Sequence, residues 1–278
     1  MKRLADSARF YVLCTRLQLR TRMTSRVDFL SQVITVFVKE GAQIALIWLV
    51  LQRFQALAGW GVWEVGVLYS LLAIARRFME AFIGGATRLS FLVLYGRFDE
   101  IAMAPRSPLF VLNARSAPWR FFYNLSIVVI FVFCATQANV PLSAVTVALV
   151  LLSVLSGALV LYALSLIVGS LAFWLTDTAE IRRLLEEIVQ YTRYPVHIYG
   201  AIIGTILTVV IPVAFVSYYP SAVLLGKVED VLFTPALGYA APAVAAVLLA
   251  LALQVWRAGI RRYSSTGFSL AGTGPEEE

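Results

Sequence analysis

The sequence carries little charge for its length. Of its 278 residues, 14% are Asp, Glu, Lys or Arg and 60% are apolar, whereas soluble proteins have about 25% charged and about 45–50% apolar residues. This composition excludes a water-soluble globular enzyme. Because a membrane-spanning helix needs about 20 mostly apolar residues, the chain has room for several spans and little else. We therefore predict an all-α polytopic membrane protein with small parts outside the bilayer.

Residues that usually carry catalysis are also scarce. The chain has one histidine, His197, and two cysteines, Cys14 and Cys134, without metal-binding spacing. A catalytic triad or proton relay would rest on a single histidine, so we interpret His197 as structural. Lys227 follows a glycine but lacks the upstream glycine and following Ser or Thr of a P-loop. We predict no catalytic site, bound cofactor or metal in this chain, and no ATP hydrolysis of its own.

Apolar stretches predict six transmembrane helices. They lie at Phe29–Leu51, Val62–Leu94, Phe121–Thr136, Ser143–Leu175, Ile198–Tyr218 and Val231–Trp256. Residues 3–24 alternate arginine with apolar residues at helical spacing, which predicts an amphipathic helix on the membrane surface within residues 1–26. Residues 1–264 are expected to form a single domain. Residues 265–278 lack apolar periodicity and are expected to be disordered.

Lysine is rare, and arginine supplies 20 of the 23 basic residues of a chain with net charge +7. In so apolar a sequence this excess indicates membrane topology rather than nucleic-acid binding, because basic loops are retained in the cytoplasm. The basic groups on one side are the segment 1–26, the loop 95–120, Arg182, Arg183, Arg193, Arg257, Arg261 and Arg262. The other side keeps only Arg53 and Lys227. Both termini are therefore predicted to be cytoplasmic.

Four charged residues are predicted to lie within the membrane. Lys39 and Glu40 fall in the first span, and Arg76 and Glu80 fall one helical turn apart in the second. Charges at that depth usually face a bundle interior or an opposite charge. The second stretch either carries them through a protein-lined interior or ends near Ala75 and continues as a cytoplasmic helix. An ion-coupled secondary transporter using these four charges is an alternative function, although no inverted repeat is visible.

The fourth predicted span is rich in small residues. They are Ser153, Ser156, Gly157, Ala158, Ser165 and Gly169. Small residues let helices approach closely in lipid, so we predict that this span packs against its neighbours. The alternative is that such residues are simply frequent in membrane helices.

Residues 176–195 are ambiguous. The pairs Arg182–Glu186 and Arg183–Glu187 predict an amphipathic helix. Hydropathy places this helix on the cytoplasmic surface and makes Ile198–Tyr218 the fifth span, because four charges in lipid are costly.

The polar loop 95–120 is the most informative segment outside the spans. Its glycine, prolines and arginines predict short helical pieces on the cytoplasmic side. Such a piece is suited to docking on another protein, with its charges setting the register and Phe98, Ile101 and Met103 filling a groove. A solvated loop without a partner is an equal alternative.

Two segments resemble a known family. LYGRFDEIAMAPRSPLFVL, and RYPVHIYG followed by VIPVAFVSYYPSAVLLG within residues 193–226, are similar to segments after the second and fourth spans of bacterial ATP-binding-cassette type-2 permeases. Together with the six spans, the likeness covers nearly the whole chain. Ala102 and Met103 depart from the pattern, which more often has Leu-Leu or Leu-Arg.

This resemblance implies the membrane subunit of an ABC exporter in the bacterial inner membrane. Residues 1–26 would form the connecting helix, and Gly96–Pro108 would hold a coupling helix seated on a separate ATPase subunit that binds ATP and Mg²⁺. The coupling residues would be Arg97, Phe98, Asp99, Glu100, Ile101, Pro105 and Arg106. Two permeases, identical or related, would pair around a pathway. The family also offers another topology, with 178–197 as the fifth span and 199–226 as a hairpin re-entering from the outer side.

Overall fold

The protein is all-helical in the part that its structure describes. The structure is a computed structural model that describes residues 11, 26–54, 59–116, 121, 124–175 and 177–263. The regular elements in these residues are helices, without a β-strand, which confirms the predicted class. The proposed connecting helix at 1–26 lies outside the described residues apart from Tyr11 and Arg26, and so does the tail at 265–278.

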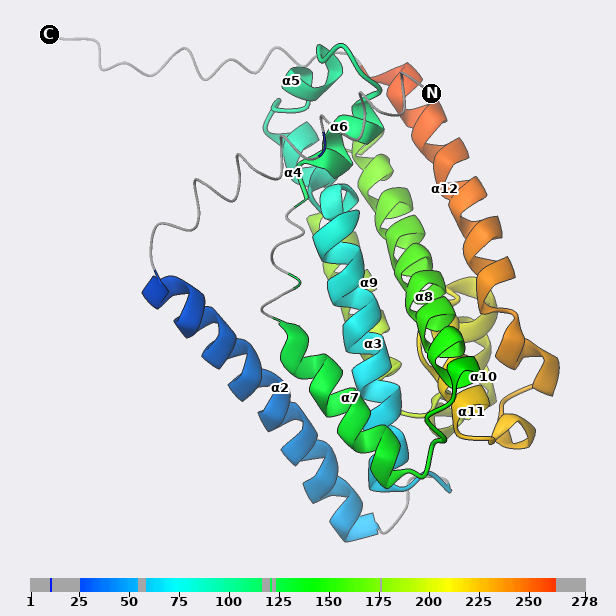
Figure 1. The fold of residues 1–278 in the computed structure, drawn as a ribbon. Helices are drawn as coiled ribbons and strands as arrows, with labels where there is room; N and C mark the ends of the chain where they lie inside the picture. Colours follow the sequence, from blue (N-terminus) through cyan, green and yellow to red (C-terminus); the bar gives the residue numbers. More distant parts are fainter. Residues whose placement is uncertain are drawn as a thin grey trace, which may run out of the picture.

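Long helices form a bundle around α8 (Figure 1). They are α2 (Arg26–Phe54), α3 (Val62–Phe82), α7 (Leu125–Gln137), α8 (Ala144–Ser170), α9 (Ala179–Tyr191) and α12 (Ala241–Arg262). Helix α8 packs on α12 and on α3, and α3 also packs on α7. Helix α2 lies at the periphery, where it touches α3 and α7 (Figure 1).

The small residues of α8 allow its close packing, as predicted. A Cβ atom added at Gly157 would lie 2.8 Å from the carbonyl oxygen of Val216 and 3.2 Å from Cβ of Ala75 on α3. One added at Gly169 would lie 3.0 Å from the carbonyl oxygen of Ala86. The backbone of α8 therefore approaches its neighbours where larger side chains would keep them apart.

Helix length and composition support a multi-pass membrane protein. Among the described residues, the helices long and apolar enough to span a membrane are Leu30–Leu49, Ala144–Phe173 and Ala241–Arg262. The bent pair Ala179–Tyr191 and Val196–Val210 adds a fourth if it is one broken span. Helix α3 has 21 residues but also four charged side chains, and α7 has only 13 residues. The count of six spans stays a prediction.

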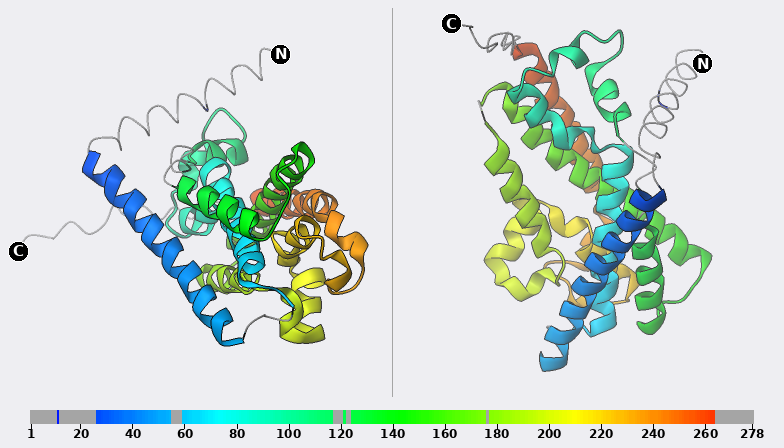
Figure 2. Two further views of the ribbon diagram at one scale, coloured as in Figure 1. Left: turned by 60° about the horizontal axis from the view of Figure 1, so that its bottom comes forward. Right: turned by 90° about the vertical axis from the view of Figure 1, so that its left-hand side faces the viewer.

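Short helices cap one end of the bundle. They are η1 (Gly84–Arg88), α4 (Leu89–Leu94), α5 (Asp99–Ala102), α6 (Pro108–Ala114) and η3 (Leu171–Phe173). Helix α3 ends before Gly84 and Gly85, and a Cβ atom at Gly85 would lie 2.3 Å from the carbonyl oxygen of Leu112. Only glycine permits this contact between η1 and α6. The C-terminal end of α12 lies at the same end of the bundle (Figures 1 and 2).

Residues 198–218 do not form one span, contrary to the hydropathy-based prediction. They are divided among η4 (Val196–Tyr199), α10 (Gly200–Thr205), the π-helix η5 (Ile206–Val210) and η6 (Val213–Phe215), followed by α11 (Tyr218–Leu224). Val196–Val210 is bent by 112° from α9. Gly200 has a φ of +77°, and Pro212 has no N–H to continue a helix. We call residues 199–226 the hairpin. Helix α9 runs from the α5 end of the bundle toward it (Figure 2, right).

The hairpin is tolerated because the surrounding protein satisfies its polar groups. The Ser217 hydroxyl donates to the carbonyl oxygen of Thr192 at 3.0 Å, and the Tyr219 hydroxyl donates to that of Leu232 at 3.1 Å. Tyr218 and Tyr219 are fully buried. Irregular backbone at membrane depth requires such protein surroundings. The chain then passes through η7 (Val228–Asp230) and η8 (Pro235–Tyr239) into α12.

Candidate functional site

The segment predicted to dock a partner, residues 95–107, lies at the capped end of the bundle. We call it the α5 segment. Its turn is set by the N–H of Phe98, which donates to the carbonyl oxygen of Leu92 at 2.9 Å, and by the N–H of Ala102, which donates to that of Phe98 at 2.9 Å. These bonds fold the segment back on α4, so the short helix α5 stands at the surface of the bundle (Figure 1).

Two of the predicted docking side chains point inward. Phe98 and Ile101 are fully buried, and the Phe98 ring lies 5.0 Å from the Tyr263 ring and 5.3 Å from the Phe173 ring, centre to centre. Its distance to the Trp256 ring is 6.1 Å. The expectation that Phe98 and Ile101 fill a partner's groove is therefore wrong for this structure. Phe98 and Ile101 anchor the α5 segment on η3 and α12. Burying a large aromatic ring among other rings stabilises the fold more than leaving it exposed to a partner.

The outer face of the α5 segment is polar with one large apolar side chain. Met103 is 78% exposed, and Arg97, Glu100 and Pro105 are also exposed. Arg97 and, from the end of α6, Arg115 approach the Glu100 carboxylate at 4.0 and 3.7 Å. Arg106 is half-buried, with its guanidinium 5.8 Å from the centre of the Phe110 ring. This face presents charge and Met103 to a partner.

Asp99 ties the α5 segment to the end of α12. The Tyr263 hydroxyl donates to Oδ1 of Asp99 at 2.8 Å. Burial, followed by this hydrogen bond and the charge of the carboxylate, raises the pKa of Tyr263 to about 12. The hydroxyl therefore stays protonated, and remains a donor to Asp99, at every physiological pH.

Three of the four predicted membrane charges, Glu40, Arg76 and Glu80, form part of a partly buried network. Glu40 is 3% exposed, and its Oε1 lies 3.2 Å from Nη2 of Arg77, while the Tyr69 hydroxyl donates to its other oxygen. Arg77 and Arg76 both pair with Glu80, at 3.1 and 3.0 Å. Helix α3 thus continues past Ala75 to Phe82, and its charges pair with other protein groups. Both predicted alternatives contain such a helix, so the choice between them stays a prediction.

The network extends to the end of α9. Nη1 of Arg193 donates to Oε1 of Gln43 on α2 at 3.2 Å, and its Nε donates to Oε1 of Gln190 at 2.6 Å. The sequence predicts Arg193 among the basic groups at the cytoplasmic side, whereas in the structure it lies beside the middle of α2. The sequence interpretation missed Tyr69, Gln43 and Arg193 as members of this network. A glutamate in the middle of a span was the available signal, because it requires several polar partners.

Lys39 is not part of this network. It is exposed on α2, next to the exposed Phe37 and Val38. Among the described residues no salt bridge involves it. Lys39, Glu40, Arg76 and Glu80 therefore do not converge on one site.

A second polar cluster lies at the opposite end of the bundle. Nζ of Lys227 lies 2.7 Å from Oε2 of Glu64 and donates to the carbonyl oxygen of Gly59 at 2.6 Å. Nδ1 of His197 lies 3.0 Å from the Tyr218 hydroxyl oxygen. The Lys227 contacts fasten the loop before η7 to the start of α3, and the His197–Tyr218 contact joins η4 to the start of α11. Within the described residues, no three His, Cys, Asp or Glu side chains are grouped to hold a metal ion.

Comparison with protein families decides the identity of this scaffold. The family model for an ABC-2 family transporter protein matches residues 37–267, which is most of the chain. The chain belongs to the ABC-2 transporter family. The resemblance carried by residues 94–112 and 193–226 is thus confirmed. Comparisons with curated proteins and with solved structures give no match.

Membership of the ABC-2 family indicates the general role of this protein. ABC-2 permeases are membrane subunits that work with a separate ABC ATPase. The protein is therefore an ABC permease-type membrane transporter. The apolar helices of this ABC-2 permease fit a multi-pass membrane location.

Proposed function

We propose that this ABC-2 family member is the permease subunit of an ABC exporter. It docks a separate ATPase through the outer face of the α5 segment and forms the translocation pathway with a second permease, identical or related. One observation carries the proposal: an exposed Met103 and flanking charges stand on a base fixed by the buried Phe98 and Ile101. When the partner moves, a segment anchored in this way moves η3 and α12 with it, because closely packed interiors transmit strain.

The distribution of charge supports the orientation of this proposal. Arg88, Arg97, Arg115, Arg261 and Arg262 all belong to elements at the α5 end (Figure 1). Basic residues flanking spans are retained in the cytoplasm. The α5 end therefore faces the cytoplasm across a bacterial inner membrane, with six spans and both termini inside. ATP and Mg²⁺ bind in the partner ATPase.

The structure gives little support to the ion-coupled alternative. Glu40 and Glu80 are neutralised by Arg77 and Arg76, and Lys39 lies exposed on α2. Binding and release of a coupling ion needs an acidic group that is free to exchange partners. A balanced network that fastens α2 to α3 has a structural role instead.

Purification of the tagged, full-length protein from its native membrane tests the proposal. We expect Mg²⁺-dependent ATP hydrolysis to co-purify with it. The Met103→Asp variant should lose most of this activity, because it places a carboxylate in the centre of the docking face. The matched control is Tyr239→Asp, which changes a 64% exposed side chain at the opposite end of the bundle and should retain the activity.

Two results contradict the proposal. The first is the absence of any co-purifying ATP hydrolysis from well-folded protein. The second is equal activity with Met103→Asp and Tyr239→Asp. A Phe98→Ala variant provides a further comparison: it should melt at a lower temperature because it removes a buried ring, whereas Met103→Asp should melt like the unmodified protein.

A further inference from the structure

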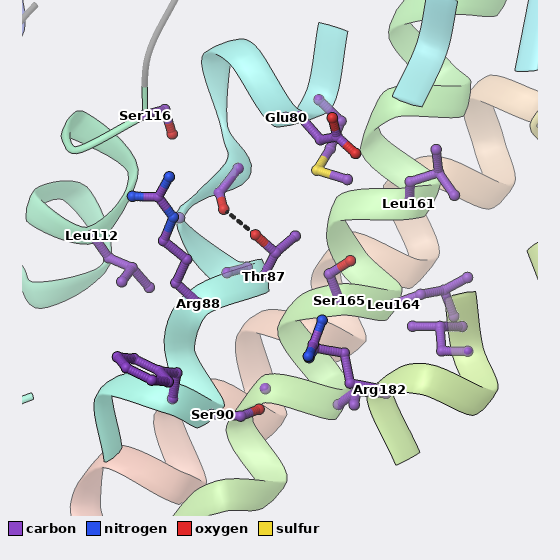
Figure 3. A pocket seen from close by; sticks show the side chains of 18 of the residues that line it. Glu80, Thr87, Arg88, Ser90, Leu112, Ser116, Leu161, Leu164, Ser165 and Arg182 are labelled. Atoms are coloured by element: carbon purple, nitrogen blue, oxygen red, sulfur yellow. Dashed lines mark hydrogen bonds between the residues drawn. The ribbon is translucent and has the colours of Figure 1, made fainter. Parts of the chain in front are cut away.

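A cavity of about 550 Å³ opens beside the capped end of the bundle. Its walls come from the end of α3, η1, α4, α6, α8 and α9 (Figure 3). These elements are distant in sequence and meet because Gly85 and Gly169 allow η1 to pack closely against α6 and α8. Met103 lies outside the lining of this cavity, whereas Arg97 and Arg115 belong both to the lining and to the outer face of the α5 segment.

The lining of this cavity is strongly basic. Its charged members are Arg76, Arg88, Arg97, Arg115, Arg182, Glu80 and Glu186. Two of the arginines are neutralised within their own helices. Arg76 pairs with Glu80 at 3.0 Å, and Arg182 pairs with Glu186 at 2.8 Å.

The remaining three arginines lack enough countercharge. Arg97 and Arg115 share the single carboxylate of Glu100, at 4.0 and 3.7 Å. Among the residues that the structure describes, Arg88 has no salt-bridge partner. This end of the cavity is therefore short of about two negative charges, the number that a phosphate monoester carries near neutral pH.

Two buried hydroxyl groups in the same lining are unsatisfied. Ser90 and Ser116 are 9% and 5% exposed, and the Oγ atom of each lacks a hydrogen-bond partner. Figure 3 shows the Arg88 side chain extending toward Ser116, with Arg182 and Ser165 on another wall. A buried hydroxyl without a partner is unfavourable. The Ser116 hydroxyl, toward which Arg88 extends, is available to donate to an anion held by the arginines, and the Ser90 hydroxyl is available in another part of the lining.

The walls from α8 and α9 are mostly apolar, although Ser165, Arg182 and Glu186 also belong to them. Leu161, Leu164 and Val168 on α8 face Leu185 and Val189 on α9. From Leu161 to Gly169 the lining follows α8 for about 12 Å at 1.5 Å per residue. That length accommodates the first carbons of an alkyl chain below a headgroup at the arginine end.

We propose that this cavity binds the phosphate headgroup and upper tail of an anionic amphiphile. The fork of the Arg88 guanidinium matches two phosphate oxygens, Arg97 and Arg115 supply further charge, and the apolar wall of α8 and α9 covers the tail. A phospholipid of the bilayer and a transported alkyl phosphate share this chemistry. The site does not depend on the coupling to an ATPase proposed above, since the permease alone contains the whole lining.

Equilibrium binding to the full-length protein in neutral detergent tests the site. The probes are dioctanoyl phosphatidic acid, dioctanoyl phosphatidylcholine and inorganic phosphate. Phosphatidic acid should bind most tightly, and Arg88→Gln should weaken it about tenfold because a charge-assisted pair is lost. The matched control is Arg183→Gln. Arg183 is exposed on α9, pairs with Glu180 and lies outside the lining, so its loss should change binding less than about twofold.

The proposal is overturned if inorganic phosphate or phosphatidylcholine binds as tightly as phosphatidic acid, or if Arg88→Gln and Arg183→Gln bind alike. Thermal melting of both variants shows whether they remain folded. Mass spectrometry of protein released directly from its membrane identifies the source. A retained phospholipid identifies a bilayer lipid, whereas an empty site that takes up added dodecyl phosphate identifies a diffusible molecule. These assays measure binding of the amphiphile and not ATP hydrolysis, and Arg88 lies outside the α5 segment, so their outcome is separate from that of the docking test.

Discussion

Nη2 of Arg77 on α3 lies 3.2 Å from Oε1 of Glu40 in the middle of α2. Helix α2 is otherwise peripheral, and many of its apolar side chains, including Leu30, Ile34 and Phe37, are exposed. The salt bridge between Arg77 and Glu40 therefore fastens an outer helix to the bundle. Its loss would leave a charge buried between two helices, which is costly at membrane depth.

We expect Arg77→Met to destabilise the protein strongly. The change leaves the Glu40 carboxylate buried without its cation, a loss of about 3–5 kcal/mol for a buried pair. The melting temperature in detergent should fall by about 10 °C. Adding Glu40→Gln to Arg77→Met should recover part of the loss, because the unpaired charge is then removed.

Lys39→Met is the control for this change. Lys39 neighbours Glu40 in sequence but is exposed, so its replacement should not lower the melting temperature. Equal melting of the Arg77→Met and Lys39→Met variants would show that the salt bridge contributes nothing to stability.

The close packing of α8 gives a second prediction. Gly157→Ala adds a Cβ atom 2.8 Å from the carbonyl oxygen of Val216 and 3.2 Å from Cβ of Ala75. The hairpin and α3 must move away from α8 to accept this atom, which lowers the free energy of unfolding by about 1–3 kcal/mol. Thermal melting should therefore show a less stable protein.

Gly41→Ala on α2 should have the opposite effect. A Cβ atom at Gly41 meets nothing within 4 Å, and alanine favours a helix over glycine by about 1 kcal/mol. The two Gly→Ala changes should shift the melting temperature in opposite directions. A lower melting temperature for both variants would mean that the space around each glycine does not determine whether a Gly→Ala change stabilises or destabilises the protein.

Several features of this arrangement could be predicted from the sequence, because helices in lipid pack through small residues and charges within a span need partners. Small residues predicted the close packing of α8, and the position of Glu40 within a span predicted that it faces the bundle interior or an opposite charge. Hydropathy failed where the outcome depends on partners from distant segments. It preferred Ile198–Tyr218 over the charged helix α9, although residues 198–218 are broken at Ile211 and Pro212.

The α5 segment is a second case in which residues from distant parts of the chain decide which side chains are buried. No local sequence pattern supplies an internal partner for Phe98 and Ile101, so the sequence predicts that they fill a partner's groove. The Phe98 ring packs instead against Phe173, Trp256 and Tyr263, which are at least 70 residues away along the chain. The arginine-lined cavity depends on six elements in the same way, and no local pattern predicts it.

Cysteine labelling should reveal the orientation of the protein. Met103→Cys and Tyr239→Cys place thiols at exposed positions at opposite ends of the bundle, in a background where Cys14 and Cys134 are replaced by Ala. With a membrane-impermeant maleimide on spheroplasts, Tyr239→Cys should react and Met103→Cys should react only after lysis. Basic residues at the α5 end are the reason. The reverse pattern would contradict the proposed cytoplasmic position of the α5 segment.

The contact between Tyr263 and Asp99 predicts a dependence of stability on pH. The pKa of Tyr263 is raised from its ordinary value of 10.0 to about 12 in the folded protein, so folding favours the protonated hydroxyl. This contribution is complete below about pH 10 and is lost as the pH rises toward 12. Tyr263→Phe should lower the melting temperature at pH 8, and the gap to the unmodified protein should close between pH 10 and 12. Tyr239→Phe, at the opposite end of the bundle, should show no such gap. A Tyr263→Phe gap that persists unchanged at pH 12 would indicate that the hydrogen bond to Asp99 does not cause it.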